Sequence, residues 1–344
     1  MKKVLVTGGT GFIGSHTVTE LVDAGYEVVI ADNLSNSRTG ALDGIQKITG
    51  VQPAFEKIDL CDKVAFADML RRHCGIDAII HFAAHKAVGE SVRQPLKYYR
   101  NNLDSLINIL ELMPEHAIEH LIFSSSCTVY GQPEKLPVTE QSPIQPATSP
   151  YGNTKQVSEA IIRDTVAAST NIQSIALRYF NPIGAHASAL IGELPTGVPN
   201  NLVPFITQTA IGIREQLSVF GNDYNTPDGS CIRDYIHVVD LAKAHVVAVG
   251  RLLDRKNKAA FEVFNLGTGH GVSVLELVHA FEKTTGVKLN YKIVARRPGD
   301  TEQVWADTAY ANKELGWKAQ STLEETLLSA WKWEKYYKES GGWE

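Results

Sequence analysis

The sequence predicts an α/β protein: a Rossmann-type, doubly wound parallel sheet with a smaller α/β substrate-binding cap. Short apolar runs rich in β-branched residues alternate with helix-like segments through the first half of the chain, as expected for parallel strands covered by helices. A cluster of glycines follows the first of these runs and opens a helix-like segment, which is typical of a nucleotide-binding turn. The apolar runs are Lys3–Thr7, Glu27–Ala31, Ala54–Ile58, Ala78–Phe82, Leu121–Ser125 and Ser174–Tyr179.

The alternation ends near residue 181, and this change predicts two regions. Residues 181–201 and 221–228 are irregular and rich in Gly, Pro and Asn. We expect residues 1–180 to form the Rossmann domain and residues 181–344 to form mainly the cap. A helix-like run, Val238–Leu253, is followed by a strand-like run, Phe261–Leu266. These runs predict that the segment of about 236–268 returns to the first domain, so that the two regions interleave.

Composition excludes several classes of protein. The 344 residues are 44% hydrophobic and 21% charged, which is enough to bury a large core. The formal net charge of −5, with no basic stripe, argues against a nucleic-acid partner. No apolar run reaches the length of a membrane span, so we expect no membrane partner. The cysteines are too dispersed for a metal site or a disulfide framework, and we expect a reducing, cytoplasmic location. They are Cys61, Cys74, Cys127 and Cys231.

The glycine cluster Gly8–Gly14 fits a dinucleotide fingerprint. Glycines permit the tight turn, the approach of backbone N–H groups to a pyrophosphate, and close packing of helix on strand. A helix-like segment, Ser15–Ala24, follows, and the second apolar run leads to Asp32. A carboxylate there can accept the ribose hydroxyls and repels a 2′-phosphate, so the sequence predicts NAD rather than NADP. Asp59, which we expect to end the third strand, is a candidate for the adenine side.

A second constellation predicts the chemistry. Tyr151 and Lys155 are four residues apart and share one face of a helix, and Ser126 follows the fifth apolar run. An ammonium and a positive nicotinamide ring both favour the phenolate over the phenol, so Tyr151 can act as a base in alcohol oxidation. Ser126 can hold the reacting hydroxyl or relay its proton.

These segments resemble a known family. TGGTGFIGSHT, DNLSNS, HFAAHKAVGES, FSSSCTVYG and SPYGNTK are similar to the extended short-chain dehydrogenase/reductase superfamily. With RYFNPIGAH, PNNLVPFI, FGNDYNTPDGSCIRDYIHVVDLA and RRPGD, the chain resembles the UDP-galactose 4-epimerases from Met1 to about Trp333. The second group of motifs lies in the cap and makes the resemblance specific.

The resemblance implies a full set of site residues. Ser126, Tyr151 and Lys155 form the catalytic group, and Tyr151 and Lys155 also contact NAD. The other cofactor contacts are Gly8, Gly11, Phe12, Ile13, Gly14, Asp32, Asn33, Asn36, Ser37, Asp59, Leu60, Phe82, Ala83, Ala84, Lys86, Asn101 and Phe180. The contacts to the UDP-hexose are Ser126, Asn181, Asn201, Leu202, Ser218, Phe220, Arg233, Tyr235, Arg297, Asp300 and Val304. No metal is expected.

The resemblance also implies the reaction and the assembly. Hydride leaves C4 of the hexose for bound NAD while Tyr151 takes the hydroxyl proton, and the 4-keto sugar turns before hydride returns to its other face. The expected product pair is UDP-galactose and UDP-glucose. A homodimer is implied through helix-like segments around Gln94–Met113 and Lys155–Ala168. The position of Val304 lines the sugar pocket near C2, where the family's specific members carry tyrosine, so the hypothesis includes UDP-GlcNAc and UDP-GalNAc as substrates.

Three alternative functions fit parts of the sequence less well. A nucleotide-sugar 4,6-dehydratase needs an acid/base pair where this chain has Cys127 and Thr128, which cannot act as one. A UDP-uronic acid decarboxylase is disfavoured by the cap motifs. A regulatory protein that senses NAD(H) without turnover has no need for Tyr151, Lys155 and Ser126 together.

Overall fold

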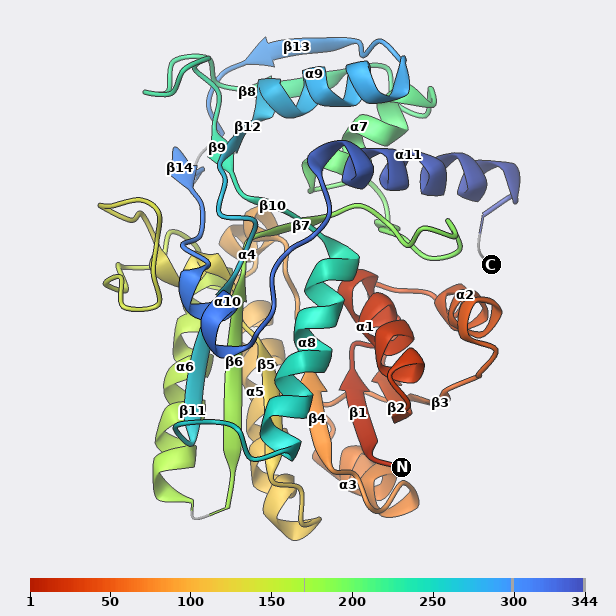
Figure 1. Cartoon of the computed structure of the whole chain (residues 1–344), viewed down its shortest axis with the longest axis vertical. Helices are drawn as coiled ribbons and strands as arrows, with labels where there is room; N and C mark the ends of the chain where they lie inside the picture. Colours follow the sequence, from red (N-terminus) through yellow and green to blue (C-terminus); the bar gives the residue numbers. More distant parts are fainter. Residues whose placement is uncertain (170, 298–299, 343–344) are drawn as a thin grey trace.

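The computed structural model describes residues 1–169, 171–297 and 300–342, and its centre is a seven-stranded sheet in the order β11-β6-β5-β4-β1-β2-β3 (Figure 1). Every neighbouring pair in this sheet is parallel. The doubly wound prediction is therefore confirmed. The strands are β1 (Lys3–Thr7), β2 (Glu27–Asp32), β3 (Ala54–Lys57), β4 (Ala78–His81), β5 (His120–Ser124), β6 (Gln173–Tyr179) and β11 (Phe261–Leu266).

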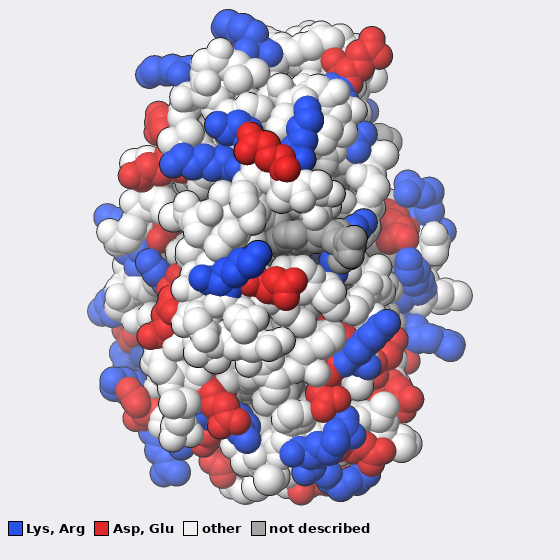
Figure 2. Space-filling model, turned by 90° about the vertical axis from the view of Figure 1, so that its right-hand side faces the viewer, with Lys and Arg blue, Asp and Glu red and all other residues white. Residues whose placement is uncertain are grey.

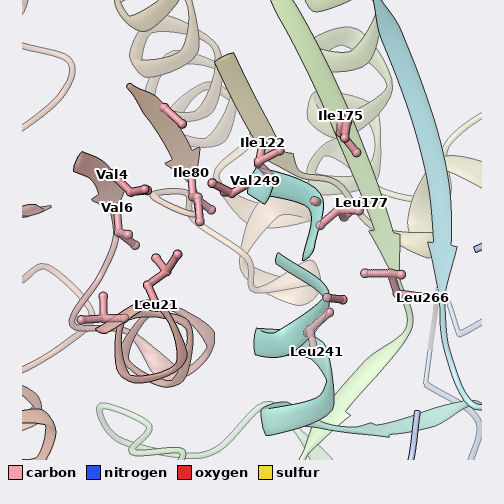
Figure 3. Close-up of a cluster of buried hydrophobic side chains, with 14 of the residues drawn as sticks. Val4, Val6, Leu21, Ile80, Ile122, Ile175, Leu177, Leu241, Val249 and Leu266 are labelled. Atoms are coloured by element: carbon pink, nitrogen blue, oxygen red, sulfur yellow. The ribbon is translucent and has the colours of Figure 1, made fainter. Parts of the chain in front are cut away.

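Helices cover both faces of the sheet, because alternate residues of each strand point to opposite sides. Val4 and Val6 of β1 pack with one layer of helices, as Figure 3 shows, whereas Leu5 between them packs with the other. The first layer is α1 (Phe12–Asp23), α2 (Gly40–Thr49), α8 (Val238–Leu253) and α10 (Ala309–Glu314). The second layer is α3 (Lys63–Arg72), α5 (Pro95–Glu115) and α6 (Pro150–Ala168).

The segment that follows the first cap strands rejoins the sheet. α8 packs on α1 in the first helix layer, and β11 pairs in parallel with β6, with Phe264 opposite Leu177. These contacts support our proposal that residues 236–268 belong with residues 1–180 and that residues 181–344 otherwise form the cap.

The cap stands over the carboxyl ends of the central strands (Figure 1). Its core includes Phe281 and Trp331, whose rings meet edge to face with centroids 5.9 Å apart. Two of its helices begin with capping boxes, Ser273 with Glu276 and Thr322 with Glu325. The cap helices are α7 (Leu202–Ala210), α9 (Val274–Thr285) and α11 (Leu323–Glu339). The small sheets are β10-β7 (Tyr235–His237, Asn181–Ile183), β12-β9-β14 (Val272–Ser273, Ile232–Arg233, Gln303–Val304) and β13-β8 (Tyr291–Val294, Leu217–Phe220).

Surface charge is mixed. On the face in Figure 2, acidic and basic side chains are interspersed, without a broad region of one sign. No helix of the described residues is long and apolar enough to cross a membrane.

Three buried histidines are held as neutral rings. Burial lowers the pKa of His16 and of His81 to about 3, and that of His245 to about 4. The Nδ1 atoms of His16 and His245 donate to the backbone oxygens of Phe12 and Leu241, at 2.7 and 2.9 Å. The described residues offer no hydrogen-bond partner to the Nε2 atom of His245, so a proton there would have no acceptor.

These histidines predict a loss of stability in mild acid. Their pKa values are lowered on folding, so the unfolded chain binds protons below about pH 6.5 while the folded chain does not. Stability is therefore highest above that pH and falls as the pH is lowered. Between pH 7.5 and 5.5 each histidine should lower the free energy of urea unfolding by on the order of 1 kcal/mol. A constant free energy over this window would contradict the assignment.

Candidate active site

The glycine loop between β1 and α1 is shaped by backbone contacts that exclude side chains. A Cβ atom on Gly14 would lie 2.2 Å from the carbonyl oxygen of Gly8, and one on Gly8 would lie 2.8 Å from the backbone nitrogen of Ala83. Gly8 also has a φ of +71°, which favours glycine. Gly11 is the N-cap of α1 and offers no side-chain cap, so the first N–H groups of Phe12 and Ile13 remain available to an anion. α1 begins at Phe12, earlier than the predicted Ser15.

The loop after β2 is tied to the glycine loop by Asp32. Its Oδ1 atom accepts from the Leu34 backbone and the Ser37 hydroxyl at 2.9 and 3.0 Å, and its Oδ2 atom accepts from the Thr10 backbone at 3.2 Å. The Asn33 amide donates to Asp59 at 3.3 Å. These bonds bring the predicted ribose and adenine residues to one edge of the sheet.

Asp59 does not end the third strand, as the sequence interpretation had it. β3 ends at Lys57, and the Oδ1 atom of Asp59 instead accepts from the backbone of Cys61 at 2.9 Å. The neighbouring Leu60 is buried, and its carbonyl accepts from Asn108. The Ile58 backbone still donates to the Asp32 carbonyl of β2 at 3.2 Å, so the chain leaves the sheet just before Asp59.

The ends of β4 and β6 complete the predicted cofactor side. Phe82, Ala83 and Ala84 follow β4 directly, and the Phe82 ring packs on His245 with centroids 4.7 Å apart. Phe180 follows β6 and is buried. Farther out, the Asn101 amide donates to Asn102, Asn36 accepts from Thr196, and Lys86 lies 3.5 Å from Glu193.

The candidate catalytic residues converge where β5 ends and α6 begins. Ser126 follows β5, and the sequence Ser149-Pro150 starts α6 with a hydroxyl cap and a proline, so that Tyr151 and Lys155 lie in its first turns. All three catalytic candidates are buried, and the Ser126 hydroxyl oxygen accepts from the Thr128 backbone at 3.2 Å. The Lys155 ammonium donates to the Ser124 carbonyl at 2.6 Å and lies 6.0 Å from the Tyr151 ring centroid.

Burial dominates the electrostatics of this group. It raises the pKa of Tyr151 well above the usual range, an effect that the bond from Ser126 opposes. It lowers the pKa of Lys155 to about 8, against the pull of Glu159. The protein alone therefore holds Tyr151 as a neutral phenol. A further positive charge is needed beside the phenol before it can lose its proton near neutral pH.

A buried ion pair beneath the site was missed by the sequence analysis. Glu159 receives two bonds from Arg178, at 2.9 and 2.5 Å, and one from the Ser125 hydroxyl at 2.5 Å. Both charged side chains are almost fully buried. Glu159 follows Lys155 by one helical turn, and that spacing was the available signal.

The cap residues form a second group opposite the catalytic side chains. Arg233 of β9 is paired in register with Val304 of β14, and Tyr235 is paired with Asn181. Val304 packs in one buried cluster with Phe180 and residues of the turn that follows Ser126, which places it against the catalytic side. Arg233 does not pair with Asp234, whose carboxylate binds backbone and hydroxyl groups of Thr268, Gly269 and Ala306.

The remaining cap candidates surround the outer part of this region. Ser218 and Phe220 lie on β8, and the Arg297 guanidinium lies 5.5 Å from the Phe220 ring centroid. Arg297 is also paired with Asp300 at 2.7 Å, while residues 298–299 of the same motif lie outside the described part of the chain. Asn201 and Leu202 are the N-cap and first residue of α7.

The comparisons with known proteins agree with this geometry. The family model described as GDP-mannose 4,6 dehydratase matches residues 5–329. UDP-glucose 4-epimerase of Bacillus subtilis (strain 168) is 51% identical over 331 residues, which cover 96% of each chain. The mouse enzyme of the same name (Mus musculus) is 50% identical over 341 residues and 97% of each chain. The chain belongs to the UDP-glucose 4-epimerase family.

A solved member of this family superposes closely. The UDP-glucose 4-epimerase of Bifidobacterium longum, in complex with NAD+ and UDP, is 46% identical with a TM-score of 0.94. The match covers 99% of this chain and 100% of that one. Family membership and fold are thereby established together. Within the described residues, no group of three His, Cys, Asp or Glu could hold a metal ion.

Proposed function

We propose that this protein is a UDP-glucose 4-epimerase, which interconverts UDP-galactose and UDP-glucose by transient oxidation at C4 with bound NAD. One observation carries the proposal: Ser126, Tyr151 and Lys155 converge at the edge of the Rossmann sheet, facing a cap whose motifs match the epimerases. Relatives of that name extend over nearly the whole chain.

The residues at the sheet edge fit NAD. The uncapped start of α1 offers N–H groups to a pyrophosphate, and a Cβ on Gly8 or Gly14 would fill the space that the backbone needs. When bound, NAD would supply the acceptor and donor of hydride and a positive charge on its ring. Asp32 would accept the ribose hydroxyls by exchanging them for the bonds it now makes with Thr10 and Ser37.

Tyr151 is proposed to remove the proton from the C4 hydroxyl and to return it at the end of the reaction. Ser126 is proposed to hold that hydroxyl beside Tyr151. Lys155 supplies positive charge from a fixed position, because its ammonium donates to the Ser124 carbonyl at 2.6 Å. Arg233 and Arg297 would clamp the diphosphate, and Phe220 would contact the uracil. Because the contacts of the protein with the substrate are mainly to its UDP part, the hexose is free to turn.

The residues of the candidate site do not support the alternative functions. A dehydratase would need an acid at Cys127, but burial raises the pKa of this thiol to about 12, so it cannot supply a carboxyl's chemistry. The cap motifs disfavour a UDP-uronic acid decarboxylase. A non-catalytic NAD(H) sensor would leave the buried group of Ser126, Tyr151 and Lys155 without a use.

A homodimer is the proposed assembly, through α5 and α6, which pack against each other. Leu96 at the start of α5 is 80% exposed and Val92 of α4 (Val88–Arg93) is 61% exposed, so this side carries apolar surface that a second copy would cover.

Tyr151→Phe is expected to fold, to retain NAD through gel filtration and to lose kcat by at least about 100-fold, because the ring still packs while the proton acceptor is gone. The measurement is conversion of UDP-galactose to UDP-glucose, followed by separation of the nucleotides. Tyr26→Phe, remote from the site beside β2, is the matched control and should keep full activity. Near-normal turnover of the Tyr151 variant would remove this residue from the mechanism.

Val304→Tyr tests the width of the sugar pocket. Valine lacks the phenol ring of the family's specific members, so we expect the wild type to interconvert UDP-GlcNAc and UDP-GalNAc as well. The substitution should abolish that reaction and largely spare the glucose/galactose pair, since only the acetamido group needs the volume. A wild type that fails to convert UDP-GlcNAc would refute the wider specificity and leave the epimerase assignment intact.

Leu96→Glu tests the dimer. A carboxylate on the proposed interface should give a monomer in sedimentation at micromolar concentration, because its burial would be uncompensated. Val64→Glu changes an equally exposed apolar residue of α3, 72% exposed, and should leave the dimer intact. A monomeric wild type, or a dimeric Leu96→Glu protein, would contradict this interface.

A further inference from the structure

Glu193 joins a residue of the cofactor side to a residue of the substrate side. Its Oε1 atom accepts a hydrogen bond from the Asn201 amide at 2.5 Å and lies 3.5 Å from the Lys86 ammonium. The Glu193 side chain is only 12% exposed, whereas that of Lys86 is 46% exposed. One shielded carboxylate oxygen thus contacts a candidate NAD residue and a candidate UDP residue.

The backbone that carries Glu193 is anchored independently of this carboxylate. The Trp333 indole donates to the Glu193 carbonyl at 3.1 Å, and a Cβ on Gly192 would lie 2.4 Å from the same indole ring. The Thr196 hydroxyl donates to Asn36 at 2.9 Å and ties the segment to the loop after β2. Shortening the Glu193 side chain should therefore leave the segment in place.

Asn201 does not cap the helix that it precedes. Asparagine is one of the best N-cap residues, yet Asn201 makes no side-chain bond to the first turn of α7. Its amide is directed to Glu193 instead. The first N–H groups of α7, from Leu202 onward, are therefore left without a side-chain acceptor.

We propose that Glu193 is a positioning residue of the UDP site, which holds Asn201 away from the first turn of α7. With Asn201 held, the second N–H of its amide and the helix N–H groups stay available to the diphosphate of the substrate. The Lys86 ammonium, 3.5 Å from the same oxygen, orients the Glu193 carboxylate. Without the carboxylate, Asn201 caps α7 and competes with the diphosphate. This inference rests on the proposed epimerase function.

The test is a double-mutant cycle on UDP binding, measured by calorimetry with the purified holoenzyme. Glu193→Ala should weaken UDP binding about tenfold, because the Asn201 side chain loses its hydrogen bond to Glu193 and is then free to cap α7. Asn201→Ala cannot cap, so adding Glu193→Ala to it should change the Kd by less than about twofold. Glu193→Gln keeps an oxygen acceptor and should stay within about threefold of the wild type. In turnover, Glu193→Ala should raise the KM for UDP-glucose and leave kcat nearly unchanged.

The binding and turnover measurements separate this inference from the proposed function. The inference would be overturned if the losses of UDP affinity of the two single variants add in the double variant, or if Glu193→Ala binds UDP as the wild type does. Either result would leave the proposed function standing, provided that the wild type epimerises UDP-galactose. A wild type that binds no UDP and converts no UDP-galactose would instead refute the proposed function. The unfolding midpoint of each variant checks that the segment remains folded.

Discussion

The buried carboxylate of Asp234 is the interaction on which the union of sheet and cap depends. It is fully buried and accepts backbone N–H groups from Thr268, Gly269 and Ala306. Thr268 and Gly269 follow the last strand of the central sheet, and Ala306 follows β14 of the cap. Burial raises the pKa of Asp234, and these hydrogen bonds oppose the shift by stabilising the carboxylate. Gly267 is required beside it, since a Cβ there would lie 2.3 Å from the carboxylate oxygen.

This junction decides how the two groups of site residues face each other. Arg233 ends β9 and Tyr235 begins β10, so the two residues lie on either side of Asp234. The Asp234 carboxylate fixes the backbone where these two strands meet, so no flexible linker separates them. In the catalytic group itself, the neutral phenol of Tyr151 is the resting state that burial imposes. Tyr151 therefore loses its proton only when a positive charge binds beside it, and in the protein alone it cannot act as a base.

Local sequence predicted the sheet closely because each strand is a short apolar run bounded by turn residues. β11 was predicted at its observed limits, Phe261–Leu266, and β6 begins only one residue before the predicted Ser174. Residues 181–201 were predicted to be irregular, yet they begin with the short strand β7, which forms only because Tyr235, distant in sequence, pairs with Asn181. No local pattern contains that information.

The site residues also divide into those that a local sequence pattern predicts and those that it does not. Glycine spacing and the Tyr151–Lys155 interval are local signals, and the structure places these residues at one edge. Glu159 pairs with Arg178, 19 residues away, and Glu193 contacts Asn201 across an irregular segment, so no helix or strand spacing could match these partners. Family resemblance supplied the cap candidates, whose roles depend on the shape of a folded cap.

The central claim is that hydride leaves C4 and returns to the same carbon while the cofactor stays bound. It is tested most directly with UDP-galactose carrying deuterium at C4, incubated with the purified protein and no added NAD. The account predicts UDP-glucose that retains the deuterium at C4, because neither the hydride nor the cofactor exchanges with the medium. Conversion with loss of the label to water, or no conversion without stoichiometric added NAD, would contradict it.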